Sequence, residues 1–266
     1  MQPATSDEKW RQILLSPSPH RRLRRIHSRI PSSPRCKLCA APFEGVGGLF
    51  MPLLGHGHWA KNPKYCEGCF RTLSKNRGGA EVECSLLFAD VRGSTSMAEG
   101  MSPKDFNRLM GRYFDTASSV LVNHDAFVDK FVGDEIIGIF VPSMAGELHA
   151  SRAVDAARAL LRATGHNDLG GPWIPVGAGV NTGIADVGSI SEGPDTELTA
   201  MGDVVNTTAR LASVAAAGEI LVTAAAAKAA RLSDDLEHRL LPLKGKSDPT
   251  DVVVLRPADG TTQSSK

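Results

Sequence analysis

The sequence predicts an α/β fold preceded by a small cysteine-rich module, and three observations support this prediction. The chain of 266 residues is 42% hydrophobic and 22% charged, which is an ordinary globular composition. Four of the five cysteines lie at or before Cys69, in a segment rich in proline and arginine. Beyond Gly79, apolar runs alternate with helical patterns, which is typical of a sheet with helices packed on one face.

These changes in composition divide the chain into four parts. The predicted parts are a basic, weakly ordered arm at 1–30, a cysteine-containing module at 31–76, a larger domain at 80–257 and a disordered tail at 258–266. Prolines near residues 17–19 and 31–34 predict extended linkers, because each proline disfavours helix in the residue before it.

The first half of the larger domain is expected to contain a strand, a helix and a hairpin. Val82–Val91 is a continuous apolar run, which is typical of a buried central strand. Ser102 followed by proline is a helix-start signal, and the predicted helix continues to about Asn123. Two β-type runs at 126–131 and 136–141 flank a Gly-Asp pair, which predicts a hairpin.

The second half is expected to add two helices and further strands. Alanine and leucine spacing predicts a helix at 145–163. Asp203 is expected to cap another helix, which ends before Gly218. The predicted strands of this half lie at 176–180 and 184–190, as a pair around an Asn-Thr-Gly turn, and at 219–222 and 251–256.

Charge and hydropathy exclude several classes of protein. A net charge of +1 gives no bulk argument for nucleic-acid or membrane binding. We expect no membrane span, because no apolar run approaches the roughly 18–20 residues that a span needs. The first residues lack the apolar core of a signal peptide, and five cysteines is an odd number. We therefore expect a cytoplasmic protein without a disulfide framework.

Two acidic residues stand where predicted strands end. Asp90 closes the first strand and Asp134 lies at the hairpin tip. If these strands are neighbours, the two carboxylates converge at one edge of the sheet and can hold two Mg²⁺ ions, which prefer oxygen ligands. The alternative for each aspartate is a turn-capping role without chemistry.

A predicted helix and a basic turn provide the complementary groups. Asn206 and Arg210 are four residues apart and therefore lie on one helical face. An amide beside a guanidinium suits a ribose or phosphate ligand. Lys244, in a Lys-Gly-Lys turn, is a further candidate for phosphate binding. Each signal alone also fits a solvated surface.

Taken together, these motifs resemble the class III nucleotidyl cyclase catalytic domain over about residues 80–256. The segments that carry the resemblance, in family order, are Phe88–Thr95, Lys130–Glu135, Asn181–Gly183, Met201–Leu211 and Lys244–Lys246. The resemblance implies a ferredoxin-like βαββαβ core that works as a head-to-tail homodimer, with two active sites at the interface. It also implies two Mg²⁺ or Mn²⁺ ions in each active site.

The resemblance assigns a role to each candidate residue. Asp90 and Asp134 match the metal-binding aspartates, and Val91 matches the position that adds a backbone carbonyl. Asn206 matches the residue that orients the ribose, and Arg210 the one that stabilises the pentacoordinate α-phosphate. In the family, the metal aspartates and the Asn/Arg pair of one site come from different subunits.

Three further positions concern the substrate. Lys244 matches a lysine near the terminal phosphates, and Lys130 matches the lysine that reads adenine. Thr199 stands where the family usually has aspartate, which resembles the IIIb subgroup and its adenine selectivity. A hydroxyl can still accept from the adenine amino group. The expected activity is therefore conversion of ATP to 3′,5′-cyclic AMP and pyrophosphate, in cyclic AMP signalling. Guanylate or diguanylate cyclase activity is the alternative.

The first part of the chain predicts a structural metal site. Two C-x₂-C pairs are separated by 26 residues, and their members are Cys36, Cys39, Cys66 and Cys69. In a reducing compartment this pattern favours a Cys₄ zinc ribbon. An iron–sulfur cluster and a thiol redox pair are the alternatives. The fifth cysteine, Cys84, is expected to be a small core residue.

An arginine-rich segment precedes this module. Six arginines lie between His20 and Arg35, and no acidic residue occurs between Glu8 and Glu44. Such a segment is either a solvated or partner-binding arm or, with the zinc module, a nucleic-acid-binding region. The second reading leads to a rival for the whole chain, a non-enzymatic nucleotide-sensing regulator.

Overall fold

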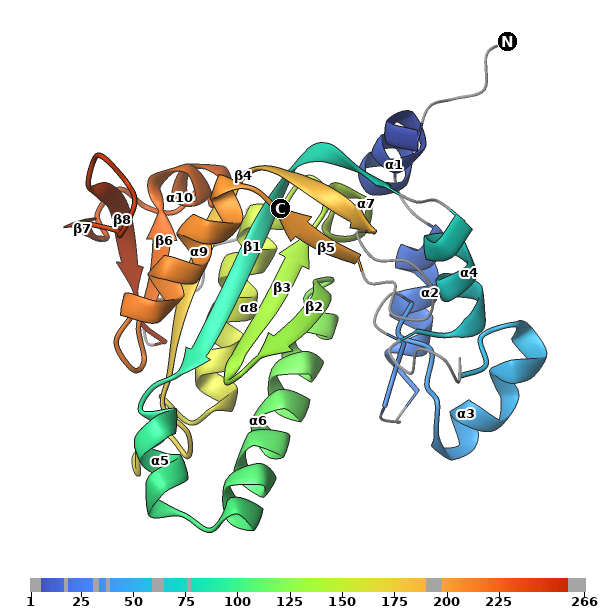
Figure 1. Ribbon diagram of the computed structural model, residues 1–266, viewed down its shortest axis with the longest axis horizontal. Coiled ribbons are helices and arrows are strands. Elements are labelled where there is room, and N and C mark those ends of the chain that lie inside the picture. Colours follow the sequence, from blue (N-terminus) through green and yellow to red (C-terminus); the bar gives the residue numbers. More distant parts are fainter. Residues whose placement is uncertain are drawn as a thin grey trace.

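The structure, a computed structural model, describes residues 6–16, 19–30, 34–36, 39–58, 65–75, 78–189 and 198–257. Figure 1 shows a mixed sheet with helices on both faces and a group of short helices beyond one end of it. The tail predicted to be disordered, 258–266, lies outside the described residues.

Among the described residues, eight strands form one sheet in the order β2-β3-β1-β4-β6-β8-β7, and β5 pairs with one end of β4. The strands are β1 (Gly78–Val91), β2 (Phe127–Val132), β3 (Glu135–Phe140), β4 (Val176–Ser189), β5 (Leu198–Met201), β6 (Ile220–Thr223), β7 (Glu237–Leu241) and β8 (Thr250–Leu255). The order β2-β3-β1-β4, with helices between β1 and β2 and between β3 and β4, is the ferredoxin-like βαββαβ arrangement. The predicted fold class is therefore confirmed.

One face of the sheet carries three helices, α6 (Pro103–Asn123), α8 (His149–Ala163) and α10 (Ala224–Ala230). Side chains alternate along a strand, so every second residue of β1 faces these helices. Those residues are Leu87, Ala89 and Val91, and they join the main core together with Tyr113 and Leu160.

The opposite face is covered as well, so the prediction of helices on one face only is wrong. α9 (Asp203–Val214) and α1 (Ser6–Leu15) pack there, because the other residues of β1, such as Leu86 and Phe88, are equally apolar and need a cover. Trp10 of α1 is only 1% exposed.

The segment at 1–30 also differs from its prediction as a weakly ordered arm. Its described residues form α1 and α2 (Pro19–His27), which are held by burial of apolar and arginine side chains against the domain. The remaining short helices are α3 (Gly45–Phe50), η1 (Pro52–Leu54), α4 (Glu67–Lys75), α5 (Ser94–Gly100) and α7 (Pro142–Ala145). We call the described residues 19–75 the cysteine head.

Several predicted elements are confirmed. The helix predicted to begin after Ser102 is α6, and the Ser102 hydroxyl accepts from the backbone N–H of Asp105. The predicted hairpin is β2–β3. The helix predicted at 145–163 is α8, which begins only at His149; Ala145 belongs instead to the short α7, which ends at Gly146 with a positive φ of 77°.

Two predictions about the second half are wrong. The strands at 176–180 and 184–190 are not a pair around a turn, because β4 runs unbroken from Val176 to Ser189 and pairs with β1 throughout. Asn181 instead uses its side chain to accept from Thr223. Asp203 does not cap α9, since the N-cap residue is Gly202.

No helix in the described part of the chain is both long enough and apolar enough to cross a membrane.

Candidate active site

The end of β1 and the tip of the β2–β3 hairpin bring three carboxylates together. Asp90 pairs across the sheet with Glu135, the first residue of β3. Asp134 precedes Glu135 in the tight turn, where Gly133 takes a positive φ of 64° that suits glycine. The expected convergence of Asp90 and Asp134 therefore follows from strand pairing.

The crowding of these carboxylates shows in their electrostatics. Burial raises the pKa of Asp90 to about 6; the Arg92 charge opposes this shift and the Asp134 charge reinforces it. Burial, with the charges of Asp90 and Asp134, also raises the pKa of Glu135 to about 7. A divalent cation relieves such repulsion between oxygen donors, so the residues present fit Mg²⁺ or Mn²⁺.

Arg92 is a residue of this site that the sequence reasoning missed. Its guanidinium donates to the Asp90 carboxylate, and also to the carbonyl of Ser213 at 2.6 Å and that of Ala215 at 3.4 Å. Arg92 thus ties the carboxylate edge to the C-terminal end of α9, where cations are favourable. The available signal was its position two residues after Asp90 at a strand end.

α9 presents the predicted Asn206 and Arg210 away from the sheet. Asn206 is exposed and Arg210 is half-buried. The helix lies so close to β4 that a Cβ on Gly179 would stand 2.7 Å from the backbone nitrogen of Ala212. The glycine thereby allows the close approach that places the helix.

The Lys-Gly-Lys turn lies beside Arg210. A Cβ on Gly245 would lie 3.2 Å from Nη2 of Arg210, and Gly245 has a positive φ of 78°. Lys244 is exposed, whereas Lys246 donates to the carboxylate of Asp203. Arg210 and Lys244 are therefore presented by adjoining segments.

A cleft of about 390 Å³ opens next to this turn and includes Lys246 and Thr207 in its lining. The Asn181–Gly183 segment also lines it. The Asn181 amide donates to the Val204 carbonyl at 3.2 Å, and its oxygen accepts from the Thr223 hydroxyl at 2.7 Å. Asn181 therefore fastens the start of α9 to the sheet.

Thr199 lies on β5, opposite Gly188 of β4. Its hydroxyl donates to the Asp129 carboxylate at 2.7 Å, and Asp129 is only 3% exposed. Lys130 follows Asp129 in β2, but its side chain lies outside the described part of the chain. Asp129 is a second residue that the sequence reasoning missed, because nothing local indicates contact between residues 70 positions apart.

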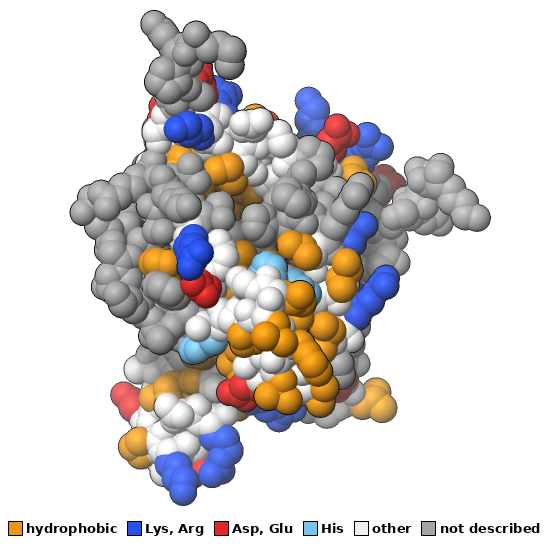
Figure 2. Space-filling model, turned by 90° about the vertical axis from the view of Figure 1, so that its right-hand side faces the viewer, with side chains coloured by type: hydrophobic (Ala, Val, Ile, Leu, Met, Phe, Trp, Pro, Cys, Tyr) orange, Lys and Arg blue, Asp and Glu red, His pale blue; other side chains and the backbone are white. Residues whose placement is uncertain are grey.

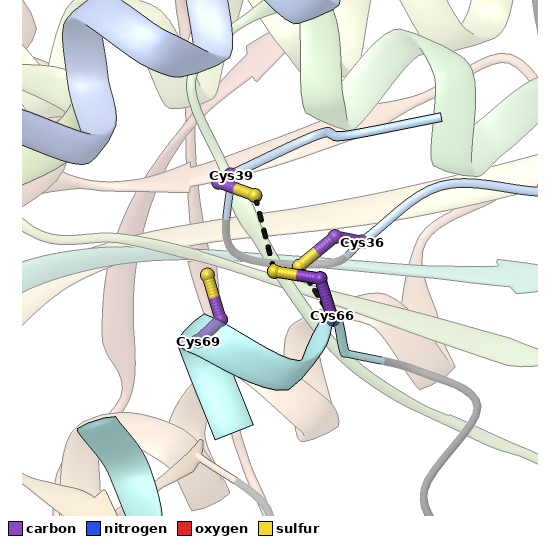
Figure 3. A group of neighbouring side chains, drawn as sticks. All are labelled: Cys36, Cys39, Cys66 and Cys69. Atoms are coloured by element: carbon purple, nitrogen blue, oxygen red, sulfur yellow. Dashed lines mark hydrogen bonds between the residues drawn. The ribbon is translucent and has the colours of Figure 1, made fainter. Parts of the chain in front are cut away.

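The four cysteines of the two C-x₂-C pairs converge, as predicted (Figure 3). Their sulfur atoms all lie within 4.8 Å of one another, and the Cys39 and Cys66 sulfurs are 3.6 Å apart. Interactions with Cys36 and the other thiols, together with burial, raise the pKa of Cys69 well above its usual value. Four thiolates cannot coexist there without a cation, so the donor set fits a tetrahedral metal.

The cysteine head contacts the strands that carry Asp129 and Thr199. Tyr65, next to Cys66, is fully buried and stacks on Phe127 of β2, with ring centroids 6.3 Å apart. The Tyr65 hydroxyl accepts from the backbone N–H of Leu198 on β5 at 3.4 Å. One side chain of the head thus contacts both strands.

Two arginines of the N-terminal segment have structural partners. Arg24 is 1% exposed and donates to the Ala126 carbonyl just before β2. Arg35 donates to the carbonyls of His27, at 2.9 Å, and Ala40, at 3.2 Å. Arg24 thus ties the head to the larger domain, and Arg35 joins two segments of the head. These contacts do not support nucleic-acid binding by these two residues.

Comparison with known proteins agrees with this geometry. The family profile of the adenylate and guanylate cyclase catalytic domain matches residues 79–254. Adenylate cyclase 1 of Rhizobium meliloti is 31% identical over 184 residues, covering 66% of this chain and 28% of that protein. Adenylate cyclase of Anabaena cylindrica is 30% identical over 131 residues, covering 48% of this chain and 26% of that protein. The chain thus spans only about a quarter of the length of these relatives.

Solved structures lead to the same family. The guanylyl cyclase Cya2 matches with a TM-score of 0.60 and 29% identity, covering 66% of this chain and 93% of that chain. The adenylyl cyclase CyaB from P. aeruginosa matches with a TM-score of 0.57 and 26% identity, covering 66% and 94%. The family profile covers the part of the chain that contains the carboxylate edge, α9 and the basic turn. The chain therefore belongs, through residues 79–254, to the adenylate and guanylate cyclase catalytic-domain family.

Proposed function

We propose that this chain is an adenylate cyclase that converts ATP to 3′,5′-cyclic AMP and pyrophosphate for cyclic AMP signalling. The relatives include both adenylate and guanylate cyclases, so similarity alone does not distinguish the two bases. The observation that favours adenine is the hydrogen bond between Thr199 and Asp129.

This hydrogen bond determines whether the Thr199 hydroxyl can donate to a bound base or only accept from it. A hydroxyl has one proton to donate and two lone pairs that accept. The proton of Thr199 is directed to the buried Asp129 carboxylate, so only lone pairs are left for a base. Adenine presents an amino group that donates to such lone pairs, whereas guanine presents a carbonyl oxygen that repels them. Lys130 is assigned to the same base by family resemblance.

The carboxylate edge is the proposed catalytic metal site. Asp90 and Asp134, with the carbonyl of Val91, would hold two Mg²⁺ or Mn²⁺ ions. Bound there, the ions supply Lewis acidity that lowers the pKa of the ribose 3′-hydroxyl and offsets phosphate charge. Arg92 holds the Asp90 carboxylate in place, and the Arg92 guanidinium is itself held by the Ser213 carbonyl at the end of α9.

Arg210, Asn206 and Lys244 are the proposed groups that hold the rest of the nucleotide. Arg210 is proposed to stabilise the charge that develops on the α-phosphate as the 3′-oxygen attacks in line and pyrophosphate leaves. Asn206 orients the ribose, and Lys244 binds the terminal phosphates. The position of Arg210 beside Gly245 supports this division of roles.

The family resemblance carries the proposal of a homodimeric site. In one protomer the Arg210 guanidinium lies beside Gly245, in the turn before β8, whereas the Asp90 carboxylate at the end of β1 accepts from Arg92. A head-to-tail pair would unite Asp90 and Asp134 of one protomer with Asn206 and Arg210 of its twin.

The cysteine head is proposed to hold one structural Zn²⁺ through Cys36, Cys39, Cys66 and Cys69. Tetrahedral zinc–thiolate bonds of about 2.3 Å separate the sulfurs by roughly 3.8 Å, close to the 3.6 Å between Cys39 and Cys66. The backbone N–H of Cys66 also points at the Cys36 sulfur at 3.3 Å, which favours a thiolate there. An iron–sulfur cluster is the alternative to zinc at these four cysteines. The five free cysteines favour a reducing, cytoplasmic location.

The test is to incubate the purified chain with ATP or GTP and identify the product. We expect cyclic AMP from ATP and far less product from GTP. Asp129→Ala should lower the ATP-to-GTP ratio of kcat/KM about tenfold, because the Thr199 hydroxyl then loses its carboxylate acceptor and its proton is free to face guanine. Thr164→Val, which removes a buried hydroxyl away from this pair, is the control. Cyclic GMP, a cyclic dinucleotide or no turnover would refute the proposal.

A further inference from the structure

Helix α3 and the following turn η1 display a concentrated apolar surface. Five large side chains of this short stretch are 59–84% exposed, and we call them the apolar tip: Val46, Leu49, Phe50, Leu53 and Leu54. Figure 2 shows hydrophobic side chains gathered on this side of the molecule. Single exposed apolar residues are ordinary on protein surfaces, but a contiguous patch marks an interaction site.

Buried side chains and backbone hydrogen bonds hold the apolar tip in place. Met51, between α3 and η1, is 6% exposed, and its carbonyl accepts from the backbone N–H of Leu54 and of His56. A Cβ on Gly48 would lie 2.6 Å from the backbone of Phe43, so only glycine lets the helix sit this close. The exposed side chains are therefore presented outward by a closely packed base.

The charge around the apolar tip decides what kind of surface it fits. No Asp, Glu, Lys or Arg occurs from residue 45 to residue 60. Residues 1–77 contain 14 Lys and Arg against 4 Asp and Glu, whereas residues 78–266 contain 16 against 25. The N-terminal part is therefore strongly basic, although the whole chain is nearly neutral.

The segment that packs against the apolar tip carries exposed basic residues. Ile30 packs against α3, because a Cβ on Gly47 would lie 2.7 Å from its side chain. Arg29, next to Ile30, is exposed, and so is Arg25, one turn earlier. An exposed apolar surface on a basic segment is the arrangement that inserts into the headgroup region of an anionic bilayer.

We propose that the apolar tip docks this chain peripherally onto a membrane surface that carries anionic lipids. A second copy of the chain is the less favourable occupant, because contact between two cysteine heads brings two strongly basic segments together. The docking surface lies on the cysteine head, apart from the proposed catalytic groups, so this proposal does not depend on the cyclase reaction.

The test is flotation of the full-length protein with lipid vesicles. We expect binding to phosphatidylcholine vesicles that contain phosphatidylserine, weak binding to phosphatidylcholine alone, and loss of binding as salt rises. The double variant Leu49→Ser/Leu53→Ser should bind at least about tenfold more weakly. Arg29→Gln should weaken binding roughly fivefold. Leu169→Ser, which replaces a fully exposed leucine of the cyclase domain, should bind like the wild type.

Three results would overturn the proposal. The first is failure of the wild type to bind the phosphatidylserine vesicles. The second is equal binding by the wild type and the double variant. The third is an oligomer larger than the catalytic dimer, in lipid-free buffer, that the double variant dissolves, because it assigns the apolar tip to a second copy. Cyclase activity without vesicles, measured on the same samples, reports the catalytic domain separately.

Discussion

Tyr65 links the cysteine head to the strands that carry the proposed base-reading residues. The substitution Tyr65→Phe removes one of its two contacts and leaves the other in place. The substitution keeps the ring stacked on Phe127 but removes the hydroxyl that accepts from Leu198. At 3.4 Å this is a long hydrogen bond, so we expect a loss of about 1 kcal/mol in the free energy of unfolding. For a domain of this size, the melting temperature should fall by about 2–4 °C.

The catalytic effect of Tyr65→Phe should be larger for binding than for turnover. Leu198 precedes Thr199, so loss of its hydrogen bond loosens β5 where the base is proposed to bind. We expect KM for ATP to rise up to about fivefold, the equivalent of 1 kcal/mol, with a smaller change in kcat. Steady-state kinetics and thermal unfolding on the same preparation measure both quantities.

A matched variant separates this local effect from general destabilisation. Thr164→Val also removes one buried hydroxyl, which donates to the Leu160 carbonyl at 2.9 Å, but it lies at the far end of α8. It should lower the melting temperature by a similar amount and leave KM unchanged. If both variants raise KM equally, or if Tyr65→Phe changes neither KM nor stability, the head does not support the base-reading strands.

Three further predictions concern the dimer, the pH dependence and the metal. Asp90→Ala and Arg210→Ala should each be inactive alone. An equal mixture of the two should recover about a quarter of wild-type turnover, because half of the dimers then contain one intact site. Absence of any recovery would argue against a site shared between protomers. Burial lowers the pKa of His166, whose Nε2 accepts from the Val176 N–H at 3.3 Å, so stability should be lost as the pH falls below about 6.5. His166→Gln keeps an acceptor without titrating and should flatten the melting temperature between about pH 8 and pH 5.5; an unchanged slope contradicts this account. Elemental analysis should find roughly one zinc per wild-type chain and none in Cys69→Ser, which should also unfold at a lower temperature; iron, or equal zinc in both, refutes the zinc assignment.

Local patterns were sufficient for much of the fold. The proline after Ser102 identified the start of α6, and the Gly133-Asp134 pair identified the hairpin. These signals succeed because a cap or a tight turn is determined by a few neighbouring residues. The same local reasoning failed at Asn181, where a turn-like sequence lies inside an unbroken strand. There, pairing with β1 along its whole length outweighs the local turn preference.

The sequence by itself determined which chemical groups this protein has: the carboxylates Asp90 and Asp134, the Asn206/Arg210 face of one helix, and two cysteine pairs with metal-ligand spacing. Only the tertiary structure decided how those groups are supported. It placed Arg92 on Asp90, Asp129 beneath Thr199, and Tyr65 of the cysteine head between β2 and β5. The physical reason is the separation along the chain between the residues that interact. Helix faces, turns and C-x₂-C pairs depend on residues a few positions apart, whereas these supporting contacts depend on strand order and on which face of the sheet each side chain meets.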